Sequence, residues 1–240
     1  MRIRSHNILK ILPALLTPLA LAAPAHSQSV NWDFTFGAIY PAHMAGGVYG
    51  GAWLGTSIDR TGVWQWDFAV GAGVHRRHYR DLAFVAGEAV TGVRPTAEID
   101  FTRTMLPLMA GPVLKLSLLE MNLPNLPGLG WAAKTGMDKV TSLEDTGLLL
   151  RPVVCHTILW SREANANGTP SERRQYRAWG WGAEAGVYFT TDDGITSTLS
   201  LLYHDVRVTR KQGSVVTGLP QNRRVDLNGV AFLLTMGFGM

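Results

Sequence analysis

Val225–Met240 reads V-D-L-N-G-V-A-F-L-L-T-M-G-F-G-M, and from Val230 onward its side chains alternate in character. The residues at odd positions are mostly small or polar. The residues at even positions are large and apolar, namely Val230, Phe232, Leu234, Met236, Phe238 and Met240. Period-two alternation is typical of a β-strand whose two faces meet different surroundings. We therefore predict a strand with one strongly apolar face, closing the chain.

The same alternation recurs along most of the chain. It is clearest in Val30–Tyr40, Trp64–Val74 and Gln175–Thr190, where aromatic residues stand near the strand ends. Aromatic residues at both ends of a strand are typical of the girdles at two membrane interfaces. Other alternating segments cover 47–57, 82–93, 96–104, 146–160 and 195–209, with weaker ones at 113–119 and 129–137. The sequence therefore predicts an all-β protein with eleven candidate strands.

The first 27 residues predict a secretory signal peptide, which leaves 28–240 as one mature domain. A basic start precedes the uncharged apolar run Ile11–Ala23, and small residues follow at Ala25 and Ser27. This three-part layout is that of an exported protein. The run is too short for a spanning helix, which needs about 20 apolar residues. We expect any membrane that the chain occupies to be crossed by strands.

Charge and cysteine usage narrow the functional classes. Removal of the three basic residues in 1–27 leaves 19 of the 22 Lys and Arg against 18 Asp and Glu. This near balance gives no reason to expect a nucleic-acid partner. Cys155 is the single cysteine, so an intrachain disulfide and a multi-cysteine metal site are excluded. Closing the sheet into a barrel is an alternative source of stability, because it leaves no unpaired edge.

An exported chain with alternating strands, aromatic strand ends and an apolar closing strand resembles the small Gram-negative outer-membrane β-barrels. The resemblance is architectural and covers nearly the whole mature chain, and no motif selects a member. It implies an antiparallel up-and-down transmembrane barrel of about ten strands, with twelve as the alternative, since the number is usually even. It also implies contact with outer-membrane lipid and lipopolysaccharide, and engagement of the C-terminal strand by the barrel-insertion machinery.

Loop lengths predict the direction of the strands. In this class the extracellular loops are long and the periplasmic turns short. We expect 76–81, 161–174 and 210–224 outside, and the turns at 94–95 and 191–194 inside. The segment 106–111 is expected to be a turn or loop. The conflict between eleven candidate strands and an even number must then arise between 95 and 147.

Strand phase places a mixed set of acids and bases on the lumen side: Asp33, Asp67, His75, Glu88, Glu98, Asp100, Lys115, Arg151, Glu184 and His204. Buried charges need partners, so we interpret this set as a network of charged pairs that fills a narrow barrel. The alternative is a polar conduit or a small-ligand site. An open pore is not expected, because the bore of so small a barrel is nearly filled by side chains.

A lipid-acting hydrolase is the third class considered. Ser200 and His204 share one face of a strand, and Glu184 lies across the 191–194 hairpin. Residues four apart on a strand are about 13 Å apart, so Ser200 and His204 do not meet directly. The sequence also lacks the G-x-S-x-G and H-E-x-x-H motifs. We expect no enzymatic activity, no metal and no cofactor.

Basic residues concentrate in the two long loops predicted to lie outside. Guanidinium groups pair well with phosphate, so we predict contacts with lipid phosphates from these residues. They are Arg173, Arg174, Arg177, Arg210, Lys211, Arg223 and Arg224. The sequence thus favours a non-enzymatic envelope barrel with a structural role. The alternative is a narrow channel, or an accessory barrel in the export of a polysaccharide or hydrophobic product.

Overall fold

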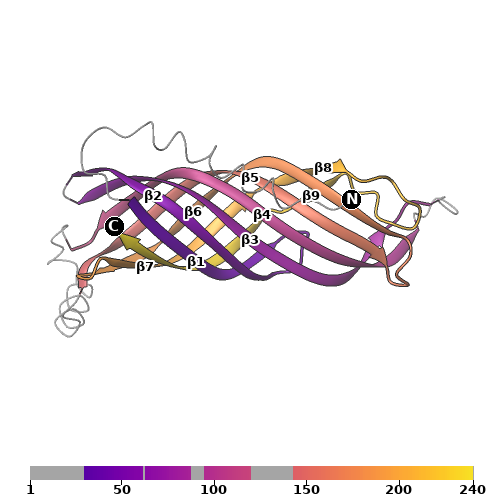
Figure 1. Cartoon of the computed structure of the whole chain (residues 1–240), viewed down its shortest axis with the longest axis horizontal. Helices are drawn as coiled ribbons and strands as arrows, with labels where there is room; N and C mark the ends of the chain where they lie inside the picture. Colours follow the sequence, from indigo (N-terminus) through magenta and orange to yellow (C-terminus); the bar gives the residue numbers. More distant parts are fainter. Residues whose placement is uncertain (1–29, 62, 88–94, 120–142, 240) are drawn as a thin grey trace, which may run out of the picture.

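The computed structural model describes residues 30–61, 63–87, 95–119 and 143–239 (Figure 1). These residues form one antiparallel sheet of ten strands, in agreement with the expected fold class and number. The strands are β1 (Val30–Pro41), β2 (Gly47–Thr61), β3 (Trp64–Phe84), β4 (Thr96–Ser117), β5 (Leu143–Asn165), β6 (Ser171–Thr191), β7 (Ile195–Asp205), β8 (Arg207–Gln212), β9 (Arg224–Asp226) and β10 (Gly229–Gly239). The expected signal peptide, Glu88 and the candidate strand 129–137 lie outside the described residues.

The sheet closes on itself. Its order is β5-β4-β3-β2-β1-β10-β7-β6-β8-β9, and β5 also pairs with β6. The pairing of β1 with β10 sets Trp32 opposite Phe238 and Tyr40 opposite Val230, which confirms the predicted seam between the first and last strands. Each long strand therefore has a hydrogen-bonded neighbour on both sides. Among the described residues, no helix is long and apolar enough to span a membrane.

The ten strands occupy eight positions around the ring. β8 continues the line of β7 after Val206, and both pair with β6. β9 and β10 likewise succeed each other, on either side of Leu227 and Asn228, and pair with β8 and β7 respectively. An eight-position ring has an interior that side chains alone can fill.

The strands run between two ends of the barrel. We call the end that holds Val30 and Gly239 the terminal end, which is the left end in Figure 1. The opposite loop end holds the connections 42–46, 166–170 and 213–223, together with Val85–Gly87 and Pro95. Arg94 of the predicted 94–95 turn lies outside the described residues, but Pro95 lies at the same end as 166–170 and 213–223, so the direction predicted for this turn is wrong.

Two predicted loops are parts of strands, so candidate strands that were counted separately belong to β3 and β4. The charged segment 76–81 belongs to β3 and pairs with β4 from Arg76–Thr104 to Asp81–Ile99. Residues 106–111 belong to β4, which runs without a break to Ser117. Much of the predicted loop 161–174 is also strand, in β5 and β6. Polar residues on both faces of 76–81, and Pro107 and Gly111 in 106–111, gave these segments the appearance of loops.

The outer surface carries a wide apolar belt. Apolar side chains at alternate positions of the long strands point outward and are exposed or partly exposed, including Phe36 (64%), Trp179 (72%) and Leu199 (61%). The belt ends part of the way along the strands toward the loop end. On β3, outward Val74 is followed by Arg76, His78 and Arg80, all exposed. The strands thus extend past the belt into a region with a polar outside.

The middle of the barrel is filled. Large inward side chains from opposite strands, including Tyr49, Met105 and Leu202, pack into one buried cluster. The void recorded between them measures about 10 Å³, which is too small for more than one water molecule. Above the belt a second buried cluster joins Ile99 and Phe101 to Leu219 of the 213–223 loop. The interior is therefore blocked at two levels.

Candidate functional site

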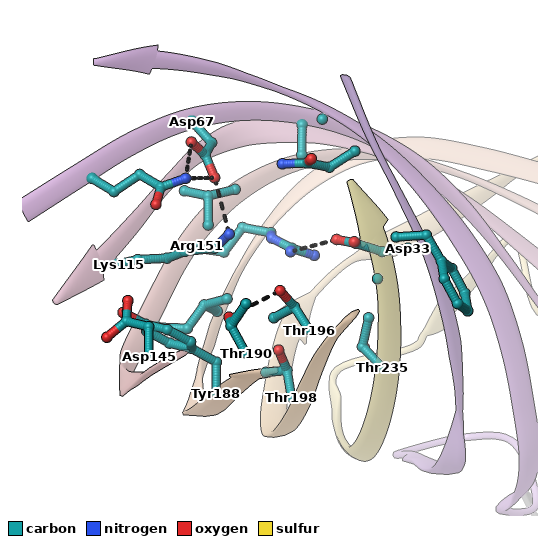
Figure 2. A pocket seen from close by; sticks show the side chains of 18 of the residues that line it. Asp33, Asp67, Lys115, Asp145, Arg151, Tyr188, Thr190, Thr196, Thr198 and Thr235 are labelled. Carbon is teal, nitrogen blue, oxygen red and sulfur yellow. Dashed lines mark hydrogen bonds and ion pairs between the residues drawn. The ribbon is translucent and has the colours of Figure 1, made fainter. Parts of the chain in front are cut away.

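A cavity of about 480 Å³ opens at the terminal end of the barrel, below the apolar cluster (Figure 2). Polar side chains make up most of its wall and come from both halves of the ring. Charged groups line one side, from β1, β3, β4 and β5. Threonine hydroxyls line the other side, from β6, β7 and β10.

The first ion pair of the cavity joins β3 to β4. The Nζ of Lys115 lies 3.2 Å from Oδ2 of Asp67, and the amide of Gln65 donates hydrogen bonds of 3.0 and 3.2 Å to the same carboxylate (Figure 2). Lys115 also stands 5.9 Å from the ring centroid of Tyr188. The Asp67 carboxylate is 5% exposed, so these donors compensate a charge removed from water.

Arg151 forms the floor of the cavity. Its Nη1 donates a hydrogen bond of 3.2 Å to Oε2 of Glu184, and its guanidinium lies 4.2 Å above the ring of Trp53. Ser200 donates a hydrogen bond of 2.6 Å to the other oxygen of Glu184. Asp33 approaches the second amino group of Arg151 at 3.7 Å, beyond hydrogen-bond length (Figure 2). The guanidinium is thus shared between one close and one distant acid.

The hydroxyl wall follows from the strand register. Thr235 of β10 stands opposite Thr198 of β7, and Thr196 of β7 stands opposite Thr190 of β6. Thr190 and Thr196 are 3.0 Å apart at their Oγ1 atoms, and Thr35 and Thr235 are 2.9 Å apart. Because side chains of period two share a face, four threonines on three adjacent strands point into the same space.

Asp145 fixes the mouth of the cavity between β4 and β6. It accepts hydrogen bonds of 2.6 Å from Ser117 and 3.0 Å from the hydroxyl of Tyr188, and one of 2.8 Å from the backbone N–H of Thr146. Sequence reasoning missed Asp145 and the threonines. Asp145 stands at a strand irregularity, and the threonines gather only through the cross-strand register.

The loop end is closed by a buried set of ionic contacts. Arg174 forms an ion pair with Glu163 and donates a hydrogen bond of 2.6 Å to the carbonyl of Pro220. Arg103 donates hydrogen bonds of 2.6 Å to the carbonyl of His43 and 2.8 Å to the hydroxyl of Tyr79. The two arginines thus hold the connections 42–46 and 213–223 against the wall.

A second cavity, of about 660 Å³, lies beside the first connection at the loop end. The β1–β2 hairpin turns at 42–46, whereas β3 continues to Phe84. The cavity is lined by 42–45 on one side, by β3 residues from Tyr79 to Phe84 on another, and by 224–226. The shortness of the first hairpin therefore leaves a recess in the rim of the barrel.

The structure places seven of the ten predicted lumen residues, Lys115 among them, on the inner face of their strands. Asp33, Asp67, Arg151 and Glu184 belong to the ion pairs described above. His75 is buried elsewhere, with its ring nitrogens 2.8 Å from the carbonyl oxygen of Val48 and 3.1 Å from that of Ala45. His204 is buried without a hydrogen-bond partner for Nε2 among the described residues.

The lumen prediction is wrong for Glu98 and Asp100. Both lie on the outer face of β4 beyond the belt, where Arg80 of β3 donates a hydrogen bond of 2.7 Å to Asp100. That hydrogen bond holds the pKa of the Asp100 carboxyl below its ordinary value. In this region Ile99 and Phe101 fill the inside, so the polar face of β4 points outward. Glu88 lies outside the described residues.

The prediction of lipid-phosphate contacts is wrong for Arg174, because its side chain is fully buried against Glu163. Arg210 is partly buried and reaches the carbonyl of Ser214 at 3.4 Å. The remaining members of the predicted set are exposed: Arg173, Arg177, Lys211, Arg223 and Arg224. Arg177 lies two residues from Trp179 on the outer face of β6, at the edge of the belt.

These features define a closed, antiparallel up-and-down β-barrel with an apolar outside, a filled centre and a polar cavity at one end. Solved structures with a similar fold are outer-membrane β-barrel proteins. A major outer-membrane protein of Thermus thermophilus is 9% identical, with 90% of this chain and 100% of that chain covered and a TM-score of 0.48. The attachment invasion locus protein Ail of Yersinia pestis is 12% identical over 89% and 97% of the two chains (TM-score 0.38). Neisserial surface protein A is 8% identical over 90% and 99% (TM-score 0.39). No protein-family model matches the sequence, and no curated protein matches it.

Proposed function

We propose that this chain is an exported outer-membrane β-barrel with a structural, non-enzymatic role in the cell envelope. The observation that carries the proposal is the closed ring with an apolar belt on its outer face. In water, such a belt would be an aggregation surface; in a bilayer it is the expected contact with lipid. The long strands of the ring pair with a neighbour on both sides, as a hydrocarbon environment requires of backbone groups.

The filled centre supports a structural role over conduction. Between the two cavities Tyr49, Met105 and Leu202 pack together with buried Thr157 and His204, and the void that they surround is about 10 Å³. Ions do not pass so narrow a constriction without movement of these side chains. The narrow channel and the export accessory, which the sequence left open, are therefore the less supported functions.

A hydrolytic function also lacks support from the interior. The hydroxyl of Ser200 donates its hydrogen bond to Glu184, and Glu184 is held by Arg151. A serine nucleophile needs a base that accepts this proton and is oriented by a third group. Here the acceptor is an acid that is already engaged in an ion pair, which suits a structural role for Ser200.

We propose that the terminal end faces the periplasm and that Arg177 contacts the phosphates of lipopolysaccharide. Arg177 is exposed and stands just past the outward indoles of Trp179 and Trp181, where the apolar belt ends. Indoles favour the boundary between hydrocarbon and headgroups, so a guanidinium two residues further along lies at the headgroup level. β10 supplies the apolar seam that we expect the barrel-insertion machinery to engage.

Cell fractionation and single-barrel conductance test this function together. We expect the protein in the outer-membrane fraction, with heat-modifiable migration on a gel, and no steady conductance in planar bilayers. Recovery as a soluble periplasmic monomer would refute the membrane assignment. Stable stepwise conductance would instead favour the narrow channel, and a Met105→Ala variant with larger steps would assign the conducting path to the lumen.

A further inference from the structure

The cavity at the terminal end has an excess of acidic groups. Four carboxylates and two cationic groups line it, belonging to Asp33, Asp67, Glu144, Asp145, Lys115 and Arg151. Glu184 lies behind the wall and engages Arg151 at 3.2 Å, which leaves less of that charge for the cavity. Surplus negative charge inside a low-dielectric barrel is unfavourable without a counter-charge. The wall therefore favours a positively charged guest.

Asp33 is the cavity carboxylate whose hydrogen-bond acceptor sites are open among the described residues. Asp67 receives Lys115 and Gln65, and Asp145 receives Ser117 and Tyr188, whereas no described residue donates a hydrogen bond to Asp33. Its one ion-pair partner within 4 Å among the described residues is Arg151, at 3.7 Å. The carboxylate is 23% exposed and borders the cavity (Figure 2). A carboxylate has about four acceptor sites, so Asp33 can receive several donors from a guest.

Thr198 is a second group without a partner. The residue is 5% exposed and lines the cavity, and its hydroxyl makes no hydrogen bond to any described residue. Its neighbours on the same wall are paired, Thr190 with Thr196 and Thr35 with Thr235. A hydroxyl can both donate and accept a hydrogen bond. Thr198 therefore offers a hydrogen-bonding group to a guest in the cavity that carries hydroxyl groups of its own.

We propose that this cavity binds a small hydroxylated organic cation, an amino sugar or amino alcohol, with its ammonium group on Asp33 and a hydroxyl on Thr198. An ammonium group carries three donors, which suit the open acceptors of Asp33. The volume of about 480 Å³ lies in the range of small-molecule sites. The proposal goes beyond a structural role, since it gives the periplasmic mouth a ligand.

Gly55 offers a way to fill the site without changing its charges. This glycine lines the cavity, and a Cβ added there would approach no atom closer than 3.6 Å, an ordinary contact. A longer side chain at this position would project into the cavity space. Gly55→Leu therefore tests whether binding needs the open volume of the cavity, while the charged groups of the cavity stay unchanged.

The experiment is calorimetric titration of the full chain in detergent micelles with glucosamine, with glucose and N-acetylglucosamine as uncharged controls. We expect saturable binding of glucosamine alone. Asp33→Asn should weaken it by about tenfold or more, the scale of a hydrogen bond to a charged group. Thr198→Val should weaken it less, and Gly55→Leu should abolish it. Asp100→Asn removes the same charge from the outer face and should leave binding unchanged.

Three results would overturn the proposal. The first is equal binding of glucose and glucosamine. The second is an equal loss of glucosamine affinity in Asp33→Asn and Asp100→Asn, which would indicate a diffuse electrostatic attraction. The third is displacement of glucosamine by Mg²⁺ that depends on Asp33, which would make this a metal site. Heat-modifiable migration of each variant checks its fold. If Asp33→Asn fails that check, unaltered binding in Gly55→Leu still refutes the site. None of these results bears on membrane insertion, so the proposed function is tested separately.

Discussion

The guanidinium of Arg174 donates a hydrogen bond of 2.6 Å to the carbonyl oxygen of Pro220 and so ties the 213–223 connection to the wall of β6. The same side chain is paired with Glu163, and both are buried. The backbone of this connection also bonds to Ala86, through Ala86 N–H to Leu219 O and Gly218 N–H to Ala86 O. Arg174 therefore supports the closure of the loop end from inside.

Arg174→Met should release this closure. Removal of one partner of a buried ion pair costs about 3–5 kcal/mol, and here Glu163 would keep only Arg103 as an ion-pair partner among the described residues, at 3.9 Å. We expect Glu163 to draw water into the loop end and the 213–223 segment to exchange its amide hydrogens faster. Hydrogen exchange followed by mass spectrometry measures this. Arg173→Met, one residue away and exposed, is the matched control and should exchange like the parent; equal protection in both variants would contradict the role of Arg174.

The apolar belt makes the effect of an added charge depend on position along one strand. Val70 and His78 both point outward from β3, one within the belt and one past its edge. We expect Val70→Arg to lower the free energy of unfolding by about 2–4 kcal/mol in lipid vesicles, and His78→Arg to change it little. Urea unfolding in vesicles measures both. Similar small effects would mean that the belt does not contact lipid.

Glu184 is bonded to both Arg151 and Ser200. Glu184→Gln and Ser200→Ala should therefore lower the free energy of unfolding by different amounts. Glu184→Gln leaves the Arg151 charge without its close partner and should cost about 3–5 kcal/mol. Ser200→Ala removes one hydrogen bond to a charged group and should cost about 1.5–3 kcal/mol. The temperature at which half of the protein changes its migration on the gel ranks the variants by stability. The reverse order would show that Glu184 is neutral and that its bond to Ser200 dominates.

Asp100 provides a pH readout outside the belt. The hydrogen bond from Arg80 lowers the pKa of the Asp100 carboxyl, so the pair is fully formed above the ordinary range of a carboxyl group. It weakens as the pH falls through the lowered pKa. We expect Arg80→Gln to raise the pKa of Asp100 toward its ordinary value in a carboxyl NMR titration. Arg76→Gln, on the same face of β3, should leave that pKa in place; if both variants shift it alike, the pairing with Arg80 is not its cause.

Arg177 should determine how firmly lipopolysaccharide is held. We expect Arg177→Gln to reduce the lipopolysaccharide that co-purifies with the protein after reconstitution, since one guanidinium–phosphate contact is lost. Lys211→Gln removes the same charge from an exposed position further from the belt and serves as the control. Quantification of bound lipopolysaccharide by mass spectrometry measures the difference. An unchanged amount in Arg177→Gln would contradict the proposed contact.

The sequence predicted which face of a strand points inward wherever the opposite face carries the apolar belt. Alternation alone oriented Asp33, Asp67, Arg151 and Glu184 inward, and it predicted the seam between the first and last strands. In these stretches the outward residues are mostly apolar, so the pattern is unambiguous. The same reasoning failed for Glu98 and Asp100, because beyond the belt the polar face is the outer one.

Other features depend on contacts between strands, which the sequence of a single strand does not reveal. Arg173 and Arg174 look alike in the sequence, and only the phase of β6 at the loop end sets the second against Glu163. The hydroxyl wall arises because Thr198 meets Thr235 in the β7–β10 register. Loops were predicted at 76–81 and 106–111 because polar and proline residues interrupt the apolar pattern, yet cross-strand pairing continues through both.

Because the strands extend past the apolar belt, a shift in the register of this sheet would be unfavourable at both ends of the barrel. A slip of one residue between β3 and β4 would turn every side chain of the moving strand to the opposite face. Near the terminal end it would turn Lys115 away from Asp67 and onto the apolar belt, and near the loop end it would move Ile99 and Phe101 from the interior to the polar outer face. A single shift would thus place a charge on an apolar surface at one end of the strand and apolar side chains on a polar surface at the other.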